Sequence, residues 1–159
     1  MNPDVVFKIA NNFALIGWLV LVFLPRWRWS ARIIAPVLIP ALLAGFYATL
    51  VVEELGNSSG GFSSLPLVAQ LFQNRAILLA GWVHYLAFDL FVGSWEVRDA
   101  QQVGIAHYLV VPCLILTFLF GPAGWLLYFA VRSVATRSFG VNNVYDRGAS
   151  PLVDSRIGR

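Results

Sequence analysis

The sequence predicts an all-α integral membrane protein with four transmembrane helices in an antiparallel bundle. The first observation is composition, because 58% of the 159 residues are hydrophobic and only 12% are charged. A soluble domain has about a quarter of its residues charged, and a chain this short lacks the interior volume to bury so much apolar surface. The second observation is a set of four apolar stretches, each near the roughly 20 residues that a helix needs to cross the hydrocarbon core.

The first two expected spans are joined by a short basic turn. The first covers about residues 5–24 and stops at Pro25. The second covers about residues 33–52 and ends at a pair of glutamates. Residues 25–32 between them read PRWRWSAR, and arginine and tryptophan together are typical of an anchor at the membrane interface. Both spans are continuously apolar, without the alternation of a membrane-barrel strand.

The third and fourth expected spans cover about residues 76–95 and 107–131. The preceding connection, residues 53–75, contains a flexible NSSGG stretch and then SLPLVAQLF, which is too short to span and is expected to lie at the interface. Residues 1–134 are therefore expected to form a four-helix transmembrane domain. Residues 135–159 are expected to form a polar, loosely ordered C-terminal tail.

Basic residues give two conflicting orientations. Lysine and arginine are enriched in the cytoplasmic connections of membrane proteins. The three arginines of the first turn, Arg26, Arg28 and Arg32, place that turn in the cytoplasm and both termini outside. Arg132 and Arg137, which follow the fourth span, indicate the opposite. The sequence therefore leaves the orientation open.

Composition and motifs exclude several classes of function. The net charge of +3 comes almost entirely from arginines near the ends of spans, which indicates membrane flanks and no nucleic-acid partner. No zinc, di-iron, nucleotide-binding or nucleophile-elbow motif is present, so neither a metal nor a cofactor is expected. His84 and His107, the two histidines, are expected about 16 Å apart in depth, which disfavours a haem held by both.

Ionisable side chains within the membrane are concentrated on the third span. His84 and Asp89 lie inside it, and Glu96, Arg98 and Asp99 lie at its exit. Such residues are costly in a membrane and are functional candidates for that reason. A structural alternative stays open for the last three, which would then form salt bridges with the basic first turn.

Helical periodicity divides the third span into two faces. Asp89 and Glu96 share a face with Trp82, Tyr85 and Val92. A neighbouring face is expected to carry His84, Phe88, Phe91 and Trp95. Counting along antiparallel spans places three residues of the first two spans near the depth of His84: Asn11, Asn12 and Tyr47.

The third and fourth spans resemble a known family. The residues that carry the resemblance are GWVHYLAFDLFVGSWEVRDAQ (81–101) and HYLVVPCLILTFLFGPAGWLLY (107–128). They are similar to the abscisic-acid-deficient-four-like family of small membrane proteins, which includes the plant plastid factor for neoxanthin synthesis. The resemblance covers about residues 5–132. Because neither a signal peptide nor a transit segment is evident before the first span, we expect a bacterial inner membrane, or a plastid membrane if the chain is organellar.

The resemblance implies that the protein modifies carotenoids, specifically xanthophylls. In plant members the reaction isomerises the 5,6-epoxide of violaxanthin to the allenic alcohol of neoxanthin, which requires an acid and a base but no cofactor. The matching positions are Asp89, expected as proton donor, His84, expected as base, and Glu96, expected to form an orienting pair with Arg98. The residues expected to contact the ligand are Trp82, Tyr85, Phe88, Trp95, Tyr47 and Asn12.

Two other functions remain open from the sequence. The runner-up to the isomerase is a non-catalytic subunit that binds pigment or assembles a larger membrane complex, for example a photosynthetic one. A third reading is a small transporter that uses His84 and Asp89 as a proton relay. In each reading the partners are membrane lipids and an apolar, lipid-like ligand.

Overall fold

The structure is a computed structural model that describes residues 2–26, 35, 37–54 and 56–137. The predicted all-α class is confirmed for this part of the chain, which contains no strand. Most of the basic first turn, the start of the second expected span and the tail from residue 138 lie outside the described residues. The helices are α1 (Pro3–Phe23), α2 (Ile39–Glu54), α3 (Leu65–Leu71), α4 (Arg75–Val103), α5 (His107–Phe120) and α6 (Pro122–Thr136).

Two of these helices are long and apolar enough to cross a membrane, α1 with 21 residues and α4 with 29. Local sequence sets their ends. Asn2 caps α1 by accepting a hydrogen bond from the Asp4 amide at 3.0 Å, and Asn74 caps α4 in the same way. Gly104 ends α4 in the left-handed conformation, with φ of +79°. The length and hydropathy of these two helices fit a membrane protein.

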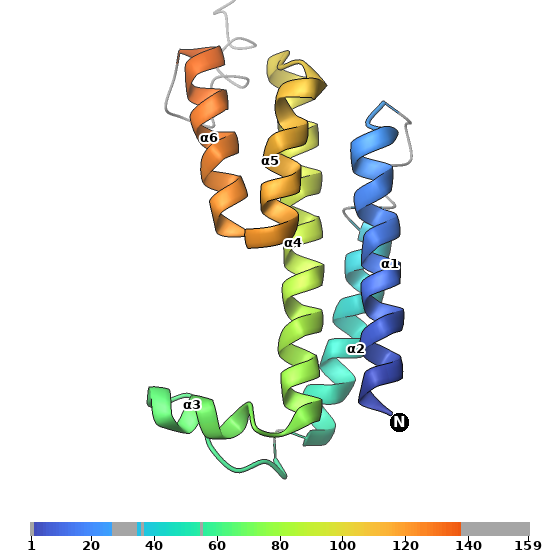
Figure 1. The fold of residues 1–159 in the computed structure, drawn as a ribbon, viewed down its shortest axis with the longest axis vertical. Coiled ribbons are helices and arrows are strands. Elements are labelled where there is room, and N and C mark those ends of the chain that lie inside the picture. Colours follow the sequence, from blue (N-terminus) through green and yellow to red (C-terminus); the bar gives the residue numbers. More distant parts are fainter. Residues whose placement is uncertain (1, 27–34, 36, 55, 138–159) are drawn as a thin grey trace, which may run out of the picture.

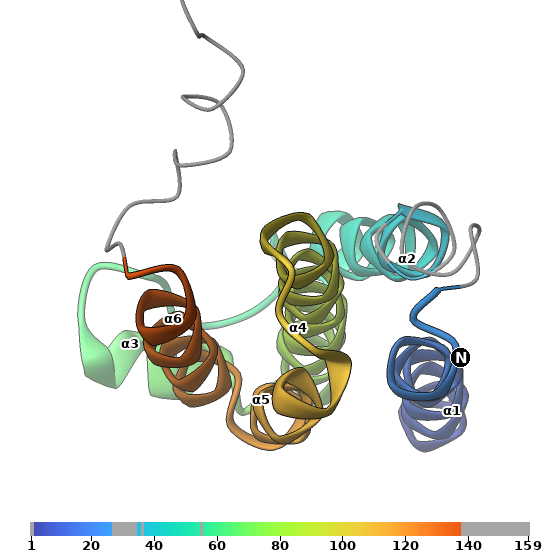
Figure 2. The same ribbon diagram turned by 90° about the horizontal axis from the view of Figure 1, so that it is seen from above.

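Helix α4 is the centre of the fold and contacts α1, α2, α5 and α6. Figure 2 shows α1 and α2 on one side of α4 and the pair α5 and α6 on the other. Close packing depends on small residues: a Cβ at Gly93 of α4 would lie 2.7 Å from the Trp18 ring of α1. The short α3 lies across the end where α4 begins, and Phe72 beside it packs on Gly81 (Figure 1).

The prediction of one continuous helix over residues 107–131 is wrong. Helix α5 ends at Phe120, and α6 begins at Pro122 and runs back beside it (Figure 1). Gly121 makes the turn with φ of +46° and ψ of −98°, a conformation that residues with a Cβ rarely adopt. At 14 residues, α5 extends about 21 Å, which is short of the hydrocarbon core. Residues 107–136 therefore form a hairpin that reaches about half the length of α4.

The hairpin removes the conflict between the basic residues. Because α6 turns back, Arg132 and Arg137 lie at the end of the molecule where α4 finishes (Figure 1). The end of α1 is at the same place, since the Gln101 side chain donates a 2.6 Å hydrogen bond to the Pro25 carbonyl. Pro25 and Arg26, which begin the basic first turn, and the basic end of α6 therefore lie at one end of the molecule, and their arginines indicate the same side of the membrane.

Candidate functional site

Asp89 and Glu96 lie on one face of α4, as their spacing predicted, and this face packs against the hairpin. Asp89 lies at the hairpin tip, where a Cβ on Gly121 would lie 2.8 Å from its Oδ1 atom. Two turns further along α4, Glu96 hydrogen-bonds to Thr117 of α5. The carboxylates of α4 are thus enclosed between this helix and α5–α6.

Glu96 is fully buried in this interface. Its Oε1 accepts a 2.9 Å hydrogen bond from the Thr117 hydroxyl. Its Oε2 atom is buried without a hydrogen-bond partner among the described residues. An unsatisfied buried carboxyl oxygen costs stability, so Glu96 is better explained by a function or a positioning role than by packing alone.

A second buried cluster joins α4 to α6 closer to the basic end. Asp99 Oδ2 accepts hydrogen bonds from the Tyr128 hydroxyl and from Arg132 Nε, both at 2.6 Å. The Arg132 side chain is completely buried, and the Asp99 side chain is 7% exposed. Breaking a buried pair by removing one partner costs about 3–5 kcal/mol. This cluster fixes the hairpin to α4 and thereby positions the tip.

The structure corrects the expected partners of Glu96 and Asp99. Asp99 pairs with Arg132 of α6, and among the described residues no arginine of the first turn forms an ion pair with it. Glu96 hydrogen-bonds to Thr117 and does not form the expected orienting pair with Arg98. The physical reason is the helix period, since residues two apart lie about 200° from each other around the axis.

Asp89 lies at the midpoint of α4, 14 residues from either end, or about 21 Å along the axis. Its Oδ2 atom is buried and has no hydrogen-bond partner among the described residues. Tyr85, one turn earlier on the same face, donates a 3.2 Å hydrogen bond to the Phe118 carbonyl at the hairpin tip. The tip therefore packs against a carboxyl and a phenol that lie one turn apart near the middle of α4.

The structure does not bring His84 and Asp89 together. The His84 ring stacks on Phe88 with centroids 4.5 Å apart and lies 5.4 Å from the Tyr47 ring of α2. The two residues lie about 140° apart around α4, because they are separated by five positions. His84, Phe88 and Tyr47 therefore form a cluster on the α2 side, while Asp89 faces the hairpin.

The remaining expected contact residues are divided among three places. Trp82 shares the Asp89 face and donates a 3.2 Å hydrogen bond to the side chain of Asn11. Asn12 is exposed on the surface of α1. Trp95 packs edge-on against Tyr128 of α6, with centroids 5.6 Å apart, and so belongs to the hairpin rather than to the His84 cluster.

A large apolar cavity lies between α2 and α4, with a volume of about 500 Å³. Its walls are aliphatic and aromatic and carry no titratable side chain: Val37, Pro40, Ala41, Ala44, Ala87, Phe88 and Phe91. Among the described residues, no three His, Cys, Asp or Glu side chains gather as ligands for a metal. Pockets of this kind hold apolar ligands.

Sequence reasoning missed Thr117, Tyr128 and Arg132 as partners of the α4 carboxylates. It treated residues 107–131 as one span, which places Arg132 at the far end of a fourth helix. The available signal was the Gly121-Pro122 pair, because this dipeptide marks turns as well as kinks.

The fold and site define a small all-helical protein of membrane type, with buried carboxyl groups between a central helix and a half-length hairpin. A family model described as ABA DEFICIENT 4-like matches residues 5–128, and the chain belongs to this family. The resemblance found in the third and fourth spans is thereby confirmed. Membership suggests a role related to the biosynthesis of carotenoids such as neoxanthin. No curated protein and no solved structure matches the chain.

Proposed function

We propose that this protein isomerises the 5,6-epoxide end group of a xanthophyll such as violaxanthin, with Asp89 as the reacting residue. Family membership supports the ligand class. The observation that carries the chemistry is the Asp89 carboxyl at the hairpin tip, which has one oxygen against Gly121 and the other without a partner among the described residues. The proposed location is a bacterial inner membrane, or a plastid membrane if the chain is organellar.

One carboxyl group suffices for both proton transfers. The neutral acid donates its proton to the epoxide oxygen, and the C–O bond to the ring carbon that lies next to the polyene breaks. The other carboxyl oxygen takes the proton from the adjacent polyene carbon. The electron pair of the broken C–H bond forms the new double bond of the allene. Asp89 ends as a neutral acid again, so the reaction balances without an oxidant or a reductant. The dry surroundings favour this route because no free charge is created in the membrane.

The neighbouring residues have positioning roles in this proposal. When the substrate binds, the Tyr85 hydroxyl, one turn from Asp89, exchanges its hydrogen bond to the Phe118 carbonyl for one to the epoxide oxygen and so orients that oxygen toward the acid. Glu96 is fully buried on Thr117 and holds α5 in place, which fixes the distance between the tip and Asp89. His84 has no part in the proton transfer, because its ring is turned toward α2.

The experiment is expression of the chain in a host that makes violaxanthin, followed by pigment chromatography. We expect an allenic product with the wild-type chain and none with Asp89→Asn, which keeps the shape of the side chain but cannot donate the proton. Glu53→Gln, an exposed substitution outside the site, serves as the matched control and should retain the product. Product formation by Asp89→Asn at the wild-type rate would refute the proposed role of Asp89.

The cavity between α2 and α4 favours a second candidate function, a pigment-binding or assembly subunit of a larger membrane complex. Its apolar walls offer a binding surface but no group that transfers protons. Pigment that co-purifies unchanged with the wild-type chain, and is lost on Ala44→Trp, would support this function. Unchanged pigment that is retained by the Ala44→Trp variant would argue against it.

A further inference from the structure

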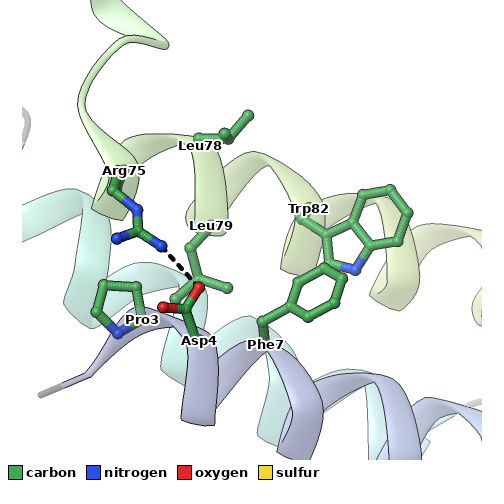
Figure 3. A pocket seen from close by; sticks show the side chains of 7 residues that line it. All are labelled: Pro3, Asp4, Phe7, Arg75, Leu78, Leu79 and Trp82. Carbon is green, nitrogen blue, oxygen red and sulfur yellow. Dashed lines mark hydrogen bonds and ion pairs between the residues drawn. The ribbon is translucent and has the colours of Figure 1, made fainter.

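A separate pocket lies between α1 and α4 near the chain's N-terminal end. Figure 3 shows its lining, in which Phe7 and Trp82 form one wall and Leu78 and Leu79 line another part. The volume is about 230 Å³. One end is polar, because Asp4 and Arg75 lie there and form an ion pair at 2.6 Å. The pocket therefore combines an apolar wall with a charged rim.

The ion pair at the rim still has hydrogen-bonding groups that a ligand can use. The Arg75 and Asp4 side chains are 68% and 66% exposed, so the ion pair covers only part of each. A guanidinium carries five N–H donors, and a carboxylate has more lone pairs than one partner uses. A hydroxyl group at this rim can accept from Arg75 and donate to Asp4 at the same time. The chemistry of the rim thus suits an alcohol.

An aromatic ladder connects this pocket to the hairpin tip. The Phe7 and Trp82 rings have centroids 5.6 Å apart, and the Trp82 and Tyr85 rings are 5.4 Å apart. The hydrogen bond from Trp82 to Asn11 holds the indole in this orientation. Tyr85 is one turn from Asp89. The ladder therefore runs from the charged rim to the proposed reaction centre along a single face of α4.

We propose that this pocket binds the hydroxylated far end of the polyene ligand whose epoxide end lies at Asp89, an inference that rests on the proposed function. Arg75 and Asp89 are 14 residues apart on one helix, which is about 21 Å along the axis. A stiff conjugated chain lying on the aromatic ladder spans this distance, with its hydroxyl between Asp4 and Arg75. The pocket thus selects hydroxylated carotenoids over hydrocarbon carotenes.

The test measures binding without reaction. Purified protein in detergent is titrated with zeaxanthin, a dihydroxy carotenoid that has no epoxide, and with β-carotene, and pigment that co-elutes in gel filtration is measured by absorbance. We expect zeaxanthin to bind about tenfold more tightly than β-carotene, because only zeaxanthin supplies a hydroxyl group for the rim. Asp4→Asn combined with Arg75→Gln should abolish this preference. These substitutions should leave the fold intact, since exposed ion pairs contribute little stability.

Two tryptophans provide a matched pair for the ladder. Trp82 and Trp125 are each 39% exposed, but only Trp82 belongs to the ladder. We expect Trp82→Leu to weaken zeaxanthin binding about tenfold and Trp125→Leu to leave it unchanged. Equal binding of the two pigments, or equal effects of the two substitutions, would overturn the inference. Violaxanthin conversion that persists in such a case would leave the proposed function standing, so the two failures are distinguishable.

Discussion

Gly124→Ala is the substitution that tests the hairpin most directly. Gly124 is buried in the first turn of α6 and faces α5. A Cβ at this position would overlap the backbone nitrogen and the Oγ1 atom of Thr117. Backbone cannot move aside as a flexible side chain can, so α5 and α6 would have to separate.

The cost of this separation has two parts. Overpacking of a close helix contact costs about 1–3 kcal/mol. Displacing Thr117 also breaks its hydrogen bond to the buried Glu96 carboxyl, which adds about 1–3 kcal/mol for a polar group left unsatisfied. We therefore expect Gly124→Ala to lower the free energy of unfolding by about 2–6 kcal/mol.

The assay is SDS-induced unfolding in mixed micelles, followed by circular dichroism. Gly45→Ala on α2 is the matched control, because a Cβ there would meet nothing within 4 Å. In an ordinary helix interior, glycine to alanine stabilises by about 1 kcal/mol. If residues 107–131 were one continuous helix, Gly124→Ala would behave like this control. A stabilising effect at Gly124 would therefore refute the hairpin, because the sign of the change separates the two structures.

Three further outcomes are expected. Asp99→Asn or Arg132→Gln alone should lower the free energy of unfolding, measured by SDS unfolding, by about 3–5 kcal/mol. The double variant Asp99→Leu with Arg132→Met should recover most of the lost stability in the same assay, because it leaves no unpaired buried charge. Reporters fused to the two termini should lie on opposite sides of the membrane with the C terminus cytoplasmic, whereas a four-span chain would place them on one side. Tyr85→Phe should reduce allenic product about tenfold in the violaxanthin-producing host while His84→Gln leaves it within twofold, and the reverse order would favour His84 as the base.

The sequence by itself determined that the protein is helical and of membrane type, and which side chains share a face of its central helix. Hydropathy is a property of local composition, and it identified α1 and α4 without knowledge of their neighbours. The helix period then placed Asp89 and Glu96 on one face and His84 on another, because side-chain direction follows from position along a helix. The family resemblance also followed from residue identity alone.

The tertiary structure decided which groups meet across the interface. A hydropathy pattern measures preference for an apolar solvent, and an apolar stretch of 25 residues reads the same whether it crosses the membrane or turns back at Gly121. The turn brings Arg132 to Asp99 and the hairpin tip to Asp89, and the packing of α5 on α4 brings Thr117 to Glu96. These contacts join residues far apart in the chain, so their partners depend on the packing of α5 and α6 against α4, which no local pattern encodes.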